Sequence, residues 1–301
     1  MEENAPSVSN AAARATEGET VIVALRVKPL LAHVDPDDAC VNVTGRSSVE
    51  VVKCGSKTSA LAPQREKRTP FAFDLAFGGA ARTEEVFRGV VVRHSLIERL
   101  MKGVNCTIFA YGATGAGKTY TMLGSGGVGG VIQMTAERLF ERVHALNSVE
   151  GGAVEIGVCA TYAEIYNESI HDLLSDGERV KLKPCEDKEG NVKILGLQSE
   201  PVDGIDDLMQ LVEIGTQRRR MSPTAANEVS SRSHAVLNVT LRWRRRGGGG
   251  TRRGRKTAMK NAVRLEASLC LIDLAGSERA ARTRNHGKQL REGANINKSL
   301  L

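Results

Sequence analysis

The sequence contains few aromatic residues and no long apolar run. Phe, Trp and Tyr make up only 4% of the 301 residues, too few for the stacking platforms that bind single-stranded nucleic acid. No apolar run approaches the roughly 20 residues that span a bilayer. Residues 1–19 are polar, without the apolar centre of a secretory signal, and are expected to form a disordered leader. We therefore expect neither a nucleic-acid partner nor a membrane partner.

The six cysteines are scattered along the chain, and none belongs to a Cys-x-x-Cys pair. Their spacing therefore lacks the usual signature of a zinc site, and their spread argues against a disulfide framework. Reduced, buried thiols of a cytosolic protein are the preferred interpretation.

The basic excess of the chain is local. Lys and Arg outnumber Asp and Glu by 42 to 35, which gives a net charge of +7. Nine basic residues and no acidic residue lie between Arg242 and Lys260, so the remainder of the chain is slightly acidic. The Gly- and Arg-rich insert at 244–260 and the basic loop at 53–70 are either solvated loops or contacts with an acidic partner surface.

Predicted strands and helices alternate along most of the chain. Such alternation is typical of an α/β protein with a mainly parallel sheet that is covered on both faces. Apolar runs predict strands at 20–27, 106–111, 155–164, 235–243 and 264–273. Periodicity predicts helices at 83–101, 135–146, 167–174 and 206–219, and hairpins at 41–53 and 180–201.

The segment after the strand at 106–111 matches the pattern Gly-x-x-x-x-Gly-Lys-[Ser/Thr]. It consists of Gly112, Ala113, Thr114, Gly115, Ala116, Gly117, Lys118 and Thr119. Glycines let backbone N–H groups turn toward phosphate oxygens, the lysine reaches the terminal phosphates, and the threonine hydroxyl ligates Mg²⁺. A flexible glycine turn with a surface lysine is the alternative, but a strand before the loop and a helix after it favour phosphate binding.

Two further segments carry chemistry that a phosphate site needs. The apolar strand ending at Asp273 supplies a carboxylate that can hold Mg²⁺, and Gly276 can offer its N–H to a γ-phosphate. Residues 227–234 concentrate hydroxyls, an arginine and an amide that can ligate the metal or position water. Alone, these segments could be an ordinary strand end and a Ser-rich loop; beside the phosphate loop, the catalytic interpretation is preferred.

Together the three segments resemble the kinesin motor family. The sequences IFAYGATGAGKTYTM, NEVSSRSHAVL and LIDLAGSERA occur in the order and spacing of that family. Weaker matches are RVKP at 26–29, YAEIYNE at 162–168 and EGANINKSLL at 292–301, and the resemblance extends from about Val21 to Leu301. Among kinesin classes, GATGAGKTYTMLGS and HGKQLREGANINKSLL look most like class eight.

The resemblance implies a P-loop NTPase fold, a three-layer α/β/α arrangement around a mainly parallel, mixed sheet. It also implies a microtubule-stimulated ATPase that uses ATP and Mg²⁺, binds tubulin, and moves along microtubules or regulates their ends. Such a protein would reside in the cytoplasm on the microtubule cytoskeleton. The chain stops at Leu301, early in the main microtubule-binding helix of the family, so we expect a motor domain from 20 to 301 that is incomplete at its C-terminus.

The resemblance also assigns an adenine site. Arg26 and Pro29 would pack on the adenine, and Tyr120 occupies the position just after the phosphate loop. Lys28 stands where the family has a second arginine, which loses the bidentate fork of a guanidinium but keeps the charge.

The resemblance further assigns a metal site and groups for hydrolysis. Thr119 and Ser231 would ligate Mg²⁺, and Asp273 would hold it through water. Ser230 and Gly276 would place the attacking water and the γ-phosphate. Positioning and charge neutralisation are most of what such a reaction needs.

A salt bridge between Arg232 and Glu278 is the last feature that the resemblance implies. A guanidinium and a carboxylate on two mobile loops can pair when nucleotide orders both loops. In a closed site, their bond helps to exclude water from the reacting phosphate.

Two other functions share parts of this pattern. A GTPase also combines a phosphate loop with Asp-x-x-Gly, but residues 297–300 read Asn-Lys-Ser-Leu and lack the Asp of the guanine-reading Asn-Lys-x-Asp. A non-catalytic microtubule-binding relative of a motor is the second alternative, although every position expected for hydrolysis is filled.

Overall fold

The structure is a computed structural model that describes residues 21–30, 40–53, 67–149, 154–177, 180–186, 192–221, 231–245 and 265–278. The expected leader at 1–19, most of the basic loop and nearly all of the basic insert lie outside these residues. The chain divides into two compact units, residues 1–79 and 80–301, and each is described by itself.

The first unit consists of short strands. Strand β1 (Ala24–Arg26) pairs in parallel with β5 (Leu75–Phe77). Strands β2 (Val41–Val43), β3 (Ser48–Lys53) and β4 (Lys67–Ala72) form an antiparallel sheet. The hairpin predicted at 41–53 is confirmed, whereas the end of the predicted basic loop is strand β4, where Val51 of β3 pairs with Thr69.

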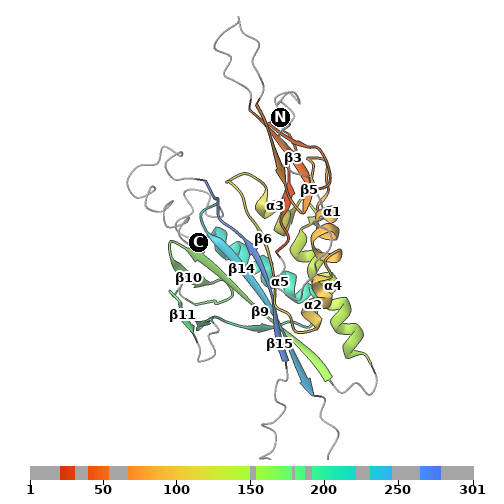
Figure 1. Ribbon diagram of the computed structural model, residues 1–301. Coiled ribbons are helices and arrows are strands. Elements are labelled where there is room, and N and C mark those ends of the chain that lie inside the picture. The colour runs from red at the N-terminus through yellow and green to blue at the C-terminus, as the bar shows by residue number, and fades with distance from the viewer. Residues whose placement is uncertain are drawn as a thin grey trace, which may run out of the picture. The chain divides into compact units, whose positions relative to one another are not determined.

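The second unit is built on a mixed sheet with the order β10-β9-β14-β15-β6 (Figure 1). Its strands are β6 (Cys106–Ala110), β9 (Val154–Tyr166), β10 (Ser169–Asp172), β14 (His234–Arg245) and β15 (Leu265–Asp273), with β13 (Glu200–Pro201) beside β9. Only β15 and β6 pair in parallel among the described strands of this sheet. The mixed sheet is confirmed, but the expectation of mainly parallel pairing is wrong for this part of the chain. The two-residue turn at Asn167 and Glu168 makes β9 and β10 antiparallel neighbours, and β14 also runs antiparallel to both β9 and β15.

The helices of this unit follow the predicted periodicity with two exceptions. They are α1 (Thr83–Phe87), α2 (Leu96–Met101), α3 (Lys118–Leu123), α4 (Val131–Asn147) and α5 (Ile205–Arg220). The single helix predicted at 83–101 is interrupted by a π-helical turn, η2 (Arg88–Val92), and by the left-handed backbone of Ser95. The helix predicted at 167–174 is wrong: Asn167 and Glu168 have positive φ angles and form a two-residue turn that leads into β10.

Two small hairpins complete the unit. Strands β7 (Gly124–Ser125) and β8 (Val128–Gly129) follow α3 directly. Strands β11 (Lys183–Glu186) and β12 (Val192–Leu195) confirm the hairpin predicted at 180–201.

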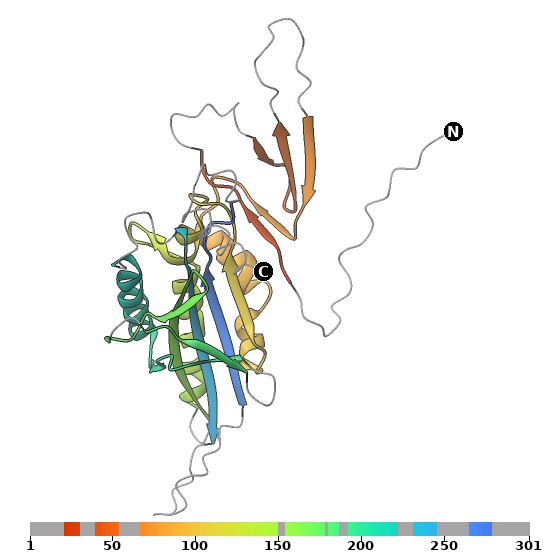
Figure 2. The same ribbon diagram turned by 90° about the vertical axis from the view of Figure 1, so that its left-hand side faces the viewer.

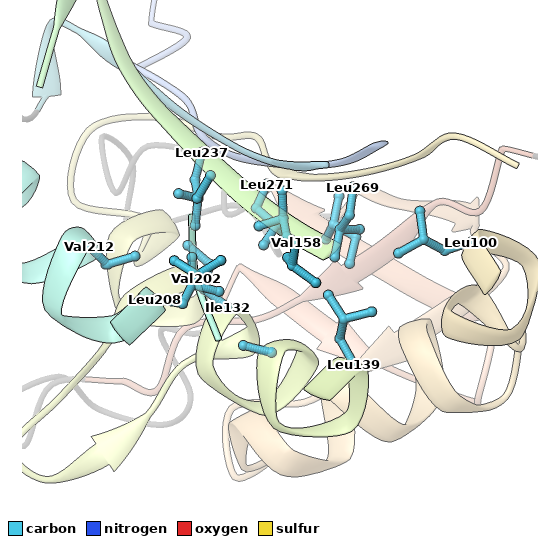
Figure 3. Packing of buried hydrophobic residues seen from close by; sticks show 14 of the residues in the cluster. Leu100, Ile132, Leu139, Val158, Val202, Leu208, Val212, Leu237, Leu269 and Leu271 are labelled. Atoms are coloured by element: carbon cyan, nitrogen blue, oxygen red, sulfur yellow. The ribbon is translucent and has the colours of Figure 1, made fainter. Parts of the chain in front are cut away.

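The core of the second unit lies between one face of the sheet and the helices. Leu237, Leu269 and Leu271 point from the sheet toward Leu139 of α4 and Leu208 of α5 (Figure 3). The side chains that alternate with them on the sheet are less buried, which is clearest in β6, where Phe109 is 57% exposed. The described residues therefore supply one of the two expected helical layers. Figure 2 shows β14 and β15 side by side in the sheet that this layer covers.

Helix α5 approaches β9 closely at Gly215. A methyl group at this position would lie 2.6 Å from Cε1 of Tyr162 and 3.2 Å from Cβ of Leu173. We expect Gly215→Ala to lower the free energy of unfolding by about 1–3 kcal/mol in urea titrations, because overpacking outweighs the better helix propensity of alanine. Gly157→Ala on β9, where nothing lies within 4 Å of an added methyl group, is the control, and equal stability of both variants would contradict the prediction.

In the described part of the chain, no helix is long and apolar enough to cross a membrane.

Candidate nucleotide site

The phosphate loop joins strand β6 to helix α3, as predicted. Gly112, Gly115 and Gly117 have φ angles of 154°, 77° and 94°, values that disfavour any residue with a Cβ. Helix α3 begins at Lys118. Backbone N–H groups at the start of a helix and in a glycine-rich turn form a concavity that favours anions, so the local backbone fits phosphate binding.

The Lys118 side chain lies inside the loop. Its Nζ donates to the carbonyl oxygens of Gly112 and Ala113, each at 2.9 Å. Burial lowers the pKa of Lys118, the carboxylates of Asp273 and Glu278 oppose this shift, and Arg219 adds to it. A cation held by uncharged carbonyls can exchange them for phosphate oxygens with a gain in electrostatic energy.

The predicted metal residues Thr119 and Asp273 are in contact. The Thr119 hydroxyl donates to Oδ2 of Asp273 at 2.8 Å, which joins the first turn of α3 to the end of β15. Among the described residues, Oδ1 of Asp273 is buried and accepts no hydrogen bond. A hydroxyl and a carboxylate that keeps one buried oxygen unsatisfied are donors that fit Mg²⁺.

The structure adds Arg219 to the site, which the sequence analysis did not assign to it. Its Nη1 donates to Oδ2 of Asp273 at 3.0 Å, and both side chains are only 3% exposed. Nε and Nη2 donate to the hydroxyl and the carbonyl oxygen of Ser233 at 3.1 and 2.6 Å. One guanidinium therefore ties helix α5 to the Asp273 carboxylate and to the residue before β14.

A signal for Arg219 was present in the sequence. Helix α5 buries Leu208, Val212 and Gly215, and Arg219 continues this stripe at a spacing of four residues. A buried arginine needs a charged partner, so its position on the apolar face pointed to an acidic residue in the core.

His234 links the start of β14 to the segment after β15. Its Nδ1 accepts a hydrogen bond from the backbone N–H of Ala275 at 3.1 Å, and the imidazole is buried. Next to it, the N–H of Gly276 donates to the carbonyl oxygen of Ser231 at 2.7 Å. Burial lowers the pKa of His234 below its ordinary value of 6.5; Arg219 lowers it further, Asp273 opposes the shift, and Lys118 adds to it.

Stability is therefore expected to depend on His234 protonation. The pKa of His234 is lower in the folded state than in the unfolded state, so the unfolded state binds more protons as the pH falls. The stability that is fully present above about pH 6.5 is therefore lost as the pH falls through the folded pKa. We expect His234→Asn, which keeps an acceptor and cannot be protonated, to flatten the fall in unfolding free energy between about pH 7 and 5. Urea titrations across this range measure it.

His171→Asn is the comparison for that measurement. Burial also lowers the pKa of His171, a backbone hydrogen bond involving Val180 opposes the shift, and Lys181 adds to it, so the same linkage applies and this variant measures how much a histidine on β10 contributes to the fall. A pH profile of His234→Asn as steep as that of the unchanged chain would contradict the assignment.

The segment from Gly276 to Glu278 lies directly against the phosphate loop. Ser277 N–H donates to the carbonyl oxygen of Gly112 at 3.1 Å. The Glu278 carboxylate accepts the N–H of Thr114 at 2.8 Å and the Thr114 hydroxyl at 2.5 Å. The predicted salt bridge from Glu278 to Arg232 stays a prediction, since the contacts described for Glu278 lead to Thr114.

The other predicted site residues are placed less completely. Ser231 and Arg232 lie just before Ser233 and the start of β14, and Ser230 lies outside the described residues. Tyr120 lies on α3 and is 45% exposed. Arg26 and Pro29 belong to the first unit, and their role at the adenine stays a prediction.

A strand, a glycine loop and a helix start, with the loop lysine and threonine beside the carboxylate of a neighbouring strand, define a P-loop NTPase. More narrowly, the chain belongs to the kinesin motor domain family, whose description matches residues 26–301. This confirms the family that the sequence motifs indicated.

Curated relatives support the same membership. The chain is 36% identical over 298 residues to "Kinesin-like protein KIN-8B" of Arabidopsis thaliana, covering 98% of this chain and 34% of that protein. It is 40% identical over 245 residues to "Kinesin-like protein 6" of Schizosaccharomyces pombe, covering 80% of this chain and 30% of that protein. The predicted resemblance to class-eight kinesins is confirmed, and the chain spans about a third of the length of these relatives.

Solved kinesin structures share the fold. A microtubule complex of dimeric KIF14 with AMP-PNP has a TM-score of 0.73 at 27% identity, covering 94% of this chain and 75% of that chain. A structure described as a fast kinesin has a TM-score of 0.72 at 26% identity, covering 92% and 71%. The kinesin fold is thereby confirmed.

Proposed function

We propose that this chain is the ATP-hydrolysing part of a microtubule motor. One observation carries the proposal: the Asp273 carboxylate accepts hydrogen bonds from both Thr119 and Arg219. This group lies beside a phosphate loop that also contacts Glu278. These contacts connect the loop to the ends of β15 and α5, so a change at a bound phosphate can move elements outside the site.

Mg²⁺ would be held by Thr119, Ser231 and Asp273, and it would neutralise charge on the phosphates of ATP. Lys118 would bind the terminal phosphates once its two loop carbonyls are exchanged for phosphate oxygens. Gly276 and Ser230 would orient the γ-phosphate and the attacking water, while Arg26, Pro29 and Tyr120 would hold the adenine. Arg219 fixes the Asp273 carboxylate and so keeps the metal-binding oxygens in place.

The partner that we propose is the microtubule, with residence on the cytoplasmic microtubule cytoskeleton. The similar KIF14 structure is described as bound to a microtubule. On this chain, Lys181, Lys183 and Lys193 are exposed on or beside the β11–β12 hairpin. Tubulin presents an acidic surface that such lysines can approach, in a manner weakened by salt.

Steady-state ATP hydrolysis by the 301-residue chain, with and without microtubules, tests the proposal. We expect hydrolysis of ATP that requires Mg²⁺ and rises when microtubules are added, with a rise that shrinks as salt increases. A rate indifferent to microtubules would contradict a motor, and microtubule binding without any hydrolysis would favour a non-catalytic binding protein.

A further inference from the structure

Thr114 directs both of its hydrogen-bond donors at one carboxylate. Its N–H donates to Oε2 of Glu278 and its hydroxyl donates to Oε1. Each carboxylate oxygen therefore has its own charge-assisted hydrogen bond, the kind that is stronger than a bond between neutral groups. The same pair of donors suits two oxygens of a phosphate equally well.

The backbone around this contact fixes it in place. Ser277 N–H bonds the carbonyl oxygen of Gly112, and Gly276 N–H bonds that of Ser231. Gly276 also lies so close to the Thr114 hydroxyl that a methyl group at 276 would overlap it. Glu278 is thus held at the phosphate loop by its neighbours as well as by its own side chain.

Glu278 brings a negative charge to this place. Partial burial alone would raise its pKa, but the hydrogen bonds from Thr114 and the nearby Lys118 outweigh burial and hold the pKa below the ordinary value of 4.5. At neutral pH the carboxylate is ionised. It therefore stands as an anion at a loop whose backbone favours anions.

We propose that Glu278 is an internal competitor for the terminal phosphate of the nucleotide, and that Thr114 is the residue that holds this competitor. The proposal rests on the proposed function, because it requires the loop to bind a nucleoside triphosphate. A phosphate that reaches both Lys118 and Gly276 approaches the Thr114 donors, and it must displace the carboxylate because two anions this close repel each other. ADP lacks the third phosphate, so the Thr114–Glu278 pair acts mainly against ATP and sets the preference between the two nucleotides.

Equilibrium binding of Mg²⁺–ATPγS and Mg²⁺–ADP to the 301-residue chain tests this inference. Glu278→Gln is isosteric and uncharged, and we expect it to tighten ATPγS binding about tenfold while ADP binding changes less than about twofold. In a Thr114→Val background, which removes one of the two hydrogen bonds, the same change should tighten ATPγS binding by about threefold or less. Thr114→Ser keeps the hydroxyl and should restore the full tenfold effect.

The outcomes separate the inference from the proposed function. ATPγS binding to Glu278→Gln that is no tighter than to the unchanged chain overturns the inference and leaves the proposed function intact. An equal tightening in the Thr114→Val background also overturns it, because Glu278 would then act without Thr114. A chain that binds neither nucleotide overturns both.

Discussion

Replacing Arg219 by methionine is expected to lower the free energy of unfolding by about 3–5 kcal/mol, the range for removing one partner of a buried ion pair. The guanidinium and the Asp273 carboxylate are each 3% exposed and 3.0 Å apart. Without the guanidinium, Asp273 would be a buried charge whose remaining described partner is the Thr119 hydroxyl, and Ser233 would lose two hydrogen bonds. Urea titration measures the loss, and hydrolysis of ATP should fall with it because the metal-binding carboxylate is no longer fixed.

Arg220→Met provides the control for this prediction. Arg220 is the next residue of the same helix and is exposed, so its replacement should change the free energy of unfolding by less than about 0.5 kcal/mol. Similar stability for the two variants would show that the buried pair contributes little beyond its packing.

The contrast between Arg219 and the phosphate loop shows what the sequence could reveal. The loop was predictable residue by residue, because its glycines, lysine and threonine are contiguous and each has a local physical reason. Arg219 acts through residues 14 and 54 positions away. Its contacts depend on how α5 lies on the sheet, which no local pattern specifies, although its place on the buried stripe of the helix was visible.

The errors in the fold prediction have a related cause. Residues 167–174 have an apolar spacing compatible with a helix, but Asn167 and Glu168 turn the chain back, so Ile170 pairs with Ile165 of β9. The gain from extending a long sheet outweighs weak helical periodicity over so few residues. The expectation of a mainly parallel sheet was also wrong, because it rested on the alternation of strands and helices, whereas the predicted strands at 235–243 and 264–273 have only the basic insert between them and pair antiparallel.

The candidate site was predicted more completely than the fold around it, and its contacts explain why. Thr119 contacts Asp273 as expected, and Ser277, next to Gly276, bonds Gly112 of the loop. The phosphate loop follows β6 and the segment with Gly276 follows β15, and these parallel strands end at the same edge of the sheet. The partner of Glu278 was not predictable, since Thr114 was placed in the phosphate loop without a side-chain role of its own. A side-chain role at this position appears only when the segment after β15 is placed against the loop.

Lys118→Met is expected to reduce kcat for ATP about 10²–10³-fold, the typical loss when one preorganised charge or donor is removed from a reacting site. Methionine retains most of the apolar stem and loses the charge, which in this chain lies 2.9 Å from two loop carbonyls and near the carboxylates of Asp273 and Glu278. The free energy of unfolding should change by no more than about 1 kcal/mol, because a buried cation is removed together with its hydrogen bonds.

Single-turnover hydrolysis separates the chemical step from binding. The control is Lys102→Met, which removes an exposed lysine at the end of α2 and should leave both the rate and the stability unchanged. A Lys118→Met chain that keeps more than a tenth of the rate would mean that this lysine does not act on the phosphates, and the proposed hydrolysis would then need a different cation.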